Sequence, residues 1–139
     1  MKRRELREHL VRLLFLRHFH EADEIEEQNQ LYFDVLLPNE GLKSESSEEV
    51  LEKYNRIIEK LPEIDQLLTS EMRKWNLNRV GIAERCILRL CVFEIKYDEI
   101  PVPVAINEAV ELAKIYGQEQ SAGFVNGVLA RLVDTNKKD

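Results

Sequence analysis

Apolar residues recur with the period of an α-helix along most of the chain, and this pattern limits the possible folds most. Near the start, a run of leucines follows the spacing i, i+4, i+7, i+8, which predicts a helix over 2–19. No segment combines the alternation of a strand with the turn residues of a hairpin. The chain is therefore predicted to be all-α. The residues of this first apolar face are Leu6, Leu10, Leu13 and Leu14.

The same period, with prolines and capping residues as boundaries, predicts about seven helices. Residues 39–47 are expected to form a loop, and Pro62 is expected to begin a new helix because its fixed φ suits a first turn. Asn78 and Ser121 are expected as N-caps, and Gly117 as a helix stop. The predicted helices cover residues 2–19, 24–37, 48–60, 63–74, 79–97, 104–116 and 122–133.

The helix predicted over 79–97 has the widest apolar surface, which is typical of a central, buried element. The stretch 61–78 separates an N-terminal half, about 1–61, from a C-terminal half, about 78–134. We therefore expect one all-α domain over 1–139 that divides naturally into these two halves.

Charge is distributed unevenly along the sequence. Residues 1–17 hold six cations and two acids, whereas residues 21–52 hold eleven acids and one lysine. A basic start on an acidic body can still bind nucleic acid locally, because the Debye length is only about 8 Å at physiological salt. The alternative interpretation is an ordinary charged helix end.

The sequence gives no sign of membrane insertion or export. No apolar run approaches the roughly 18 residues of a membrane span, and the charged N-terminus lacks the apolar core of a signal peptide. Two cysteines without an export signal are typical of a reducing compartment, so a cytoplasmic protein is expected.

Residues suited to metal binding or catalysis form no recognisable pattern. Cys86 and Cys91 are separated by about 7.5 Å along one predicted helix, which argues against a disulfide or a shared metal. His18 and His20 diverge on a helix, and His9 is isolated. There is no phosphate-binding glycine loop, nucleophile elbow or zinc-protease motif. We expect no metal, no cofactor and no enzyme activity.

The arginines at the start are the feature that packing explains least. Arg3, Arg4 and Arg7 can cluster on one side of the first helical turn. Cations at a helix N-terminus interact unfavourably with the helix dipole, so helix stability alone does not explain these arginines. Because arginine binds phosphate oxygens and stacks on bases, single-stranded RNA is the expected ligand, with Phe15 or Phe124 as an aromatic platform.

The segment GFVNG allows two interpretations. Gly123 and Gly127 are four residues apart, so they would let two helix backbones approach closely, and packing alone would explain the motif. Alternatively, Phe124 and its neighbours line a recognition surface.

Three segments carry the motifs of one known family. Residues 102–132 read VPVAINEAVELAKIYGQEQSAGFVNGVLARL, residues 79–95 read RVGIAERCILRLCVFEI, and the chain starts with RRELREHLVRLLF after its first two residues. The helix VAINEAVELAK, the glycine turn and the helix FVNGVL together make a specific combination. In these segments the sequence resembles the NusB family of bacterial transcription antitermination factors, whereas residues 20–60 match weakly.

The resemblance implies an all-helical, non-enzymatic protein built from two small bundles. NusB proteins bind the boxA element of nascent RNA together with NusE, a ribosomal small-subunit protein. The complex helps RNA polymerase to resist termination, notably on ribosomal RNA operons. Monomers and homodimers are both compatible with the resemblance.

The resemblance also assigns roles to individual residues. Glu84 and Arg85, at the start of the long helix, match positions near the NusE contact. Phe15 stands where many members have a tyrosine, so stacking would remain without the hydrogen bond of the hydroxyl. The residues implied to bind RNA are Lys2, Arg3, Arg4, Arg7, Phe15, Gln118, Gln120, Ser121 and Phe124.

Two other functions remain as alternatives. The acidic stretch 21–52 favours a helical protein–protein interaction module without an RNA role. NusB-like domains also occur fused to RNA methyltransferases, but this sequence has no glycine-rich cofactor loop for such an enzyme.

Overall fold

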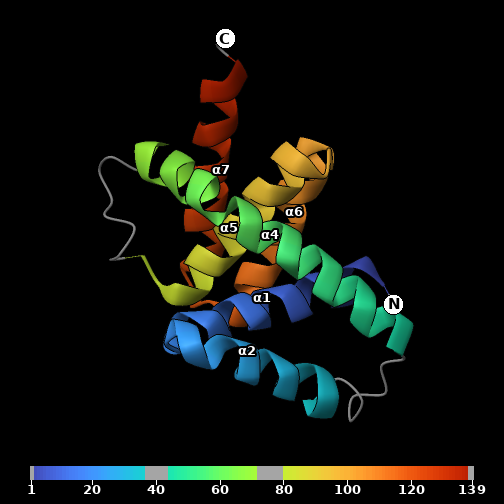
Figure 1. Cartoon of the computed structure of the whole chain (residues 1–139). Coiled ribbons are helices and arrows are strands. Elements are labelled where there is room, and N and C mark those ends of the chain that lie inside the picture. The colour runs from blue at the N-terminus through green and yellow to red at the C-terminus, as the bar shows by residue number, and fades with distance from the viewer. Residues whose placement is uncertain (1, 37–43, 72–79, 138–139) are drawn as a thin grey trace. The chain divides into compact units, whose positions relative to one another are not determined.

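A computed structural model describes residues 2–36, 44–71 and 80–137 (Figure 1). These residues form six α-helices and one short π-helical segment, without a strand, which confirms the all-α prediction and its count of about seven helices. The elements are α1 (Arg3–Phe19), α2 (Ala22–Leu31), η1 (Tyr32–Leu36), α4 (Ser44–Glu71), α5 (Ile82–Tyr97), α6 (Val102–Tyr116) and α7 (Ser121–Lys137). None of the described helices is long and apolar enough to span a membrane.

The chain divides into two compact units, Met1–Ile58 and Glu59–Asp139. In the first unit, α1 packs against α2, which runs on into η1. In the second unit, α6 packs against both α5 and α7, and α5 also contacts α7. Helix α4 contributes its first half to the first unit and its second half to the second.

Helix α5 is buried around most of its surface, as its wide apolar pattern predicts. The face of α6 that is buried consists largely of small side chains, which lets neighbouring helices approach its backbone closely. The buried residues of α5 include Cys86, Ile87, Leu88, Leu90, Cys91, Val92 and Phe93, and those of α6 are Ala105, Ala109, Leu112 and Ala113.

In the first unit, the predicted leucine face of α1 is buried, and a polar residue is buried with it. His9 is only 5% exposed, and its Nδ1 lies 2.7 Å from the hydroxyl of Tyr32 in η1. This hydrogen bond satisfies both buried polar groups and fixes η1 against α1. His9 therefore has a structural role.

The predicted boundary at Pro62 is wrong, because this proline lies inside the 28-residue helix α4. The apolar face continues across it: Ile57, Ile64 and Leu68 follow the helical spacing i, i+7, i+11 and are all buried. Proline removes one backbone hydrogen bond of the helix, but burial of a continuous apolar face outweighs that loss. Residues 44–47, predicted as loop, form the first turn of the same helix.

Three further boundaries differ from the prediction. Helix α2 begins at Ala22, because the side chains of Glu21 and Glu24 cap its first turn reciprocally, and the helix changes to π-helical geometry at Tyr32. Helix α5 has Gly81 at its N-cap, and the predicted cap Asn78 lies outside the described residues. Ser121 is the first residue of α7 rather than its N-cap.

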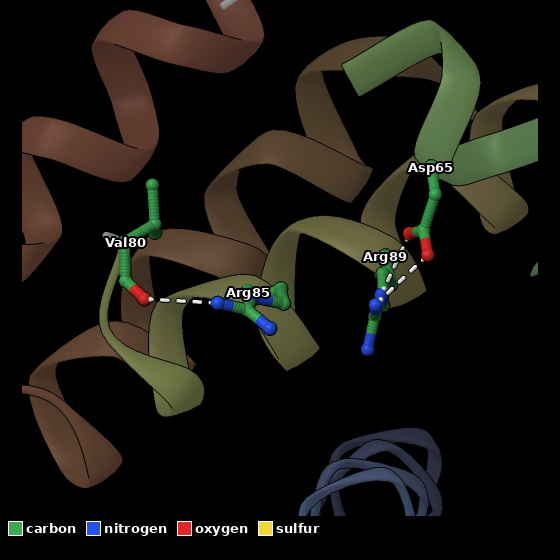
Figure 2. Close-up of polar contacts among 4 residues, drawn as sticks. All are labelled: Asp65, Val80, Arg85 and Arg89. Carbon is green, nitrogen blue, oxygen red and sulfur yellow. Dashed lines mark hydrogen bonds and ion pairs between the residues drawn. The ribbon is translucent and has the colours of Figure 1, made fainter. Parts of the chain in front are cut away.

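Two polar contacts join the second half of α4 to α5. Nε and Nη2 of Arg89 donate to the two carboxylate oxygens of Asp65, each at 2.8 Å (Figure 2). Glu63, two residues before Asp65, accepts a hydrogen bond from the Tyr97 hydroxyl at 2.5 Å, and this bond raises the pKa of Tyr97. The paired arginine fork fixes the register between the two helices.

We expect Asp65→Asn to destabilise the protein by about 1–3 kcal/mol, because it breaks a bidentate pair whose arginine side chain is only 15% exposed. Urea denaturation measures this loss. Glu111→Gln is the matched control: it breaks the exposed pair with Lys114 and is expected to cost less than about 0.5 kcal/mol. Equal losses from the two substitutions would contradict the role assigned to Asp65.

Candidate nucleic-acid interface

The first turn of α1 presents cations to solvent. Lys2 is the N-cap residue in an extended conformation, and its carbonyl oxygen accepts a hydrogen bond from the backbone N–H of Leu6 at 3.1 Å. The side chains of Lys2, Arg3 and Arg4 are exposed. The unsatisfied N–H groups of a first helical turn add a partial positive charge to these cations, so the end of α1 attracts anions.

Arg7 does not share this exposed side. Its side chain is only 4% exposed, and it lies on the buried face of α1 with Leu10 and Leu14, which follow it by three and seven residues. The predicted cluster of three arginines is therefore divided: Arg3 and Arg4 face solvent, whereas Arg7 is part of the packed side of the helix.

The opposite end of α1 carries an exposed aromatic pair. Phe15 is 38% exposed and Phe19 58% exposed, and their ring centroids lie 4.9 Å apart. The ring of His18 also contacts Phe19, at 5.4 Å. An apolar pair open to solvent in this way offers flat surfaces on which unpaired bases can stack.

The cations and aromatics lie on one face of α1. The positions 4, 8, 12, 15 and 19 follow helical spacing, and none of the five side chains is buried. They extend over about 22 Å of helix. We call this set the α1 stripe, and it consists of Arg4, Glu8, Arg12, Phe15 and Phe19.

Sequence reasoning missed three members of the α1 stripe, namely Glu8, Arg12 and Phe19. The spacing of these residues in the sequence could have identified them. Arg12 follows Arg4 by eight residues and Phe19 follows Phe15 by four, so each pair lies on one face of a helix.

The predicted RNA-contacting turn before α7 belongs to the second unit. Gln118 and Gln120 are exposed there, and Phe124 is half-buried. Ser121, by contrast, is only 4% exposed. Its hydroxyl oxygen accepts a hydrogen bond from the backbone N–H of Gln118 at 2.8 Å, so this side chain shapes the turn from within.

Gly117 ends α6 as predicted, but for a different reason. Its backbone is extended, with φ −95° and ψ −167°, and not left-handed. A Cβ atom at this position would lie 2.7 Å from the carbonyl oxygen of Ala113 and closer still to Ser121. Glycine is required because it leaves space for Ser121.

Glu84 and Arg85, the predicted partner-binding residues, are engaged inside the second unit. The Ser121 hydroxyl donates to the half-buried carboxylate of Glu84. Arg85 is 7% exposed, and its Nη2 donates to the carbonyl oxygen of Val80 at 3.5 Å (Figure 2). The start of α5 and the turn before α7 are thus joined through Glu84.

The close helix approach predicted at the two glycines of GFVNG is wrong for the described residues, although Val125 of this motif is buried. Gly123 and Gly127 are exposed on α7, and a Cβ atom at either position would meet nothing within 4 Å. Glycine in a helix costs about 1 kcal/mol relative to alanine, and no contact with another described residue offsets that cost at either position. The remaining interpretation is a recognition surface that includes the neighbouring Phe124.

The described residues show no cluster of side chains suited to a metal ion, and the thiol of Cys86 is not activated. They contain no group of three or more histidine, cysteine or carboxylate side chains arranged to hold a metal ion. Cys86 and Cys91 are free and buried. Burial raises the pKa of the Cys86 thiol to about 11, so it is neutral at physiological pH and a poor nucleophile.

Comparison with known proteins identifies the same family along nearly the whole chain. The family model of the NusB family matches residues 4–134. A transcription antitermination protein NusB from Lachnoclostridium phytofermentans is 51% identical over 96% of this chain and 100% of its own length. The corresponding protein of Agathobacter rectalis is 43% identical over 94% of this chain and 98% of its own.

A solved structure agrees with these relatives. NusB of T. maritima superposes with a TM-score of 0.77 at 33% identity, covering 96% of this chain and 92% of that one. The sequence and structure comparisons therefore agree over both compact units.

We expect Gly117→Ala to destabilise the protein by about 1–3 kcal/mol, because the new methyl group forces Ser121 out of its place. Gly123→Ala is the matched control: it meets open space within a helix and is expected to stabilise by about 0.5–1 kcal/mol. Thermal unfolding of both variants measures the difference. Effects of the same sign would contradict the requirement for glycine at position 117.

Proposed function

The chain belongs to the NusB family, and on this premise we propose that it is an RNA-binding transcription antitermination factor. It binds boxA-type single-stranded RNA of nascent transcripts, including those of ribosomal RNA operons, together with NusE. The resulting complex acts on RNA polymerase so that it resists termination. The names of the relatives, transcription antitermination protein NusB, support this proposal.

The α1 stripe is the observation that carries the RNA-binding part of the proposal. Cations near the N-terminal end bind phosphate oxygens, and the pair of Phe15 and Phe19 stacks with bases. Single-stranded RNA is the ligand that needs both chemistries along one line, because its bases are free to stack. Arg7 supports this surface from the packed side of the helix rather than by direct exposure.

The turn before α7 provides a second set of RNA contacts. The exposed amides of Gln118 and Gln120 can bond base edges or the ribose 2′-hydroxyl, and Phe124 lies one turn into the helix. Ser121 holds the turn in shape through its bond to the Gln118 N–H. The open glycines of α7 allow a ligand to approach the helix backbone there.

NusE is proposed to contact the start of α5, at Glu84 and Arg85. Because Glu84 accepts a hydrogen bond from Ser121, a partner that moves this carboxylate would also adjust the RNA-contacting turn. Cooperative binding of NusE and RNA would follow from this link.

The chain is proposed to act as an adaptor in the cytoplasm, without a cofactor and without catalysis of its own. A homodimer that covers the α1 stripe would prevent RNA from binding there. The oligomeric state is therefore measured together with each RNA titration. A purely protein-binding role would appear as NusE binding without any RNA selectivity.

Binding to a short boxA-type RNA is expected to show a salt slope near −3, from roughly four phosphate contacts at about 0.7 each. Arg4→Glu is expected to weaken binding and flatten the slope, with unchanged helical circular dichroism. Lys96→Glu is the control, because it reverses an exposed charge on α5. The titration is run with and without NusE, beside a scrambled RNA.

Tighter, sequence-selective binding in the presence of NusE is the expected result. Equal binding to both RNAs with and without NusE would overturn the antitermination proposal. If Arg4→Glu binds like Lys96→Glu, the α1 stripe is not the RNA-binding surface.

We expect Phe15→Ala and Phe19→Ala each to weaken RNA binding by about 1–3 kcal/mol, because each loses a stacking surface for one base. Phe15→Tyr is expected to retain binding, since its ring is preserved. Val104→Ala, at a side chain that is 46% exposed on α6, controls for loss of exposed apolar area. Affinities within twofold of the parent for both alanine variants would refute stacking.

A further inference from the structure

A groove in the first unit is not used by the proposed RNA contacts. It has a volume of about 620 Å³ and is lined by the end of α1, by α2 and η1, and by α4 up to Ile58. This volume lies within the range of sites that bind ligands or side-chain clusters. Its lining includes apolar side chains from three elements, and one of them, Leu51, is 40% exposed.

The charged side chains of the lining are two acids and one cation, beside the amides of Asn29, Gln30 and Asn55. Glu26 of α2 and Asp34 of η1 face the groove, together with one cation, Arg17. Among the described residues, no ion pair joins Arg17 to either carboxylate. Both carboxylates are therefore available to a ligand.

The surroundings of the groove strengthen the negative field. Residues 21–36, which form α2, its N-cap and η1, contain no lysine, arginine or histidine. Their six acids are Glu21, Asp23, Glu24, Glu26, Glu27 and Asp34. An RNA backbone is repelled from such a surface, whereas a cationic segment is attracted to it.

Two features of the groove reduce the stability of the fold and have no structural explanation: the π-helical geometry of η1 and a buried hydroxyl group. Phe33 and Asp34 reach it from η1, whose π-helical geometry is rare and occurs often at functional sites. Tyr54 also lines the groove and is 3% exposed, yet its hydroxyl has no hydrogen-bond partner among the described residues. A bound polar group would satisfy such a hydroxyl.

We infer that this groove is a docking site for a short basic segment of a partner protein, with an apolar or aromatic side chain between lysines or arginines. The apolar side chain inserts beside Phe33 and Leu51, and the flanking cations pair with Glu26 and Asp34. The arrangement follows the usual design of peptide grooves, with a buried anchor and a charged rim. The inference is independent of RNA binding.

The test uses the full chain and a short fluorescent peptide that carries a Trp-Leu pair between lysines, followed by anisotropy. Two analogues accompany it, one with glutamate for lysine and one with serine for Trp and Leu. We expect both analogues to bind at least about tenfold more weakly than the parent peptide.

Variants of the chain locate the binding. Glu26→Lys is expected to weaken peptide binding about tenfold, whereas Glu27→Lys, with the same change of net charge at the next residue of α2, leaves it within about twofold. Leu51→Ser is expected to weaken binding about tenfold, and Val104→Ser, which removes an equally exposed side chain, is the control.

Equal effects of Glu26→Lys and Glu27→Lys would overturn the inference, because they would mean diffuse attraction to an acidic surface. Equal binding of the serine analogue would overturn it as well. Self-association that Leu51→Ser abolishes would show that the groove holds a second copy instead. RNA affinity, measured in parallel, is expected to be unchanged in all four variants. A failure of the groove proposal can therefore be told apart from a failure of the RNA-binding proposal.

Discussion

Burial of α5 is the constraint on which the second unit depends. A helix that is apolar on nearly every side needs neighbours on several faces, and α6 and α7 both pack against it. The small buried side chains of α6 let these helices approach closely. The turn between α6 and α7 is then short and crowded, so position 117 has no room for a side chain and Ser121 is held inside. The exposed Gln118 and Gln120 are thus presented by a turn whose shape is set by core packing.

Helix α1 has two chemically different faces. One face buries leucines together with Arg7 and His9, and the other exposes the α1 stripe. Exposed phenylalanines and cations opposing the helix dipole contribute little to stability. Their placement along one line is therefore better explained by a ligand than by folding. The same reasoning applies to Gly123 and Gly127, where alanine would make a better helix and nothing in the described structure excludes it.

Periodicity in the sequence was enough to predict the fold class, the buried face of α1 and the central helix, because burial follows the helical repeat directly. Prediction from local sequence was wrong at Pro62, where proline was expected to begin a new helix. Burial of a continuous apolar face keeps the helix intact there. The spacing of Arg3, Arg4 and Arg7 gave proximity along the helix but not the burial of Arg7, since that depends on what packs against it. The groove was beyond sequence reasoning, because its lining comes from four elements and a π-helical turn that no motif marks.

The geometry of α1 also separates the two proposed ligands of the first unit. Arg17, which lines the groove, follows Phe15 by two residues, a rotation of about 200° around the helix. The groove and the α1 stripe therefore lie on opposite sides of α1. One side offers cations and aromatic rings to an anionic, unstacked strand, and the other offers carboxylates and apolar side chains to a cationic peptide. The carboxylates of Glu26 and Asp34 repel an RNA backbone from the groove, so we expect the two proposed ligands to bind on different sides of α1 without competing.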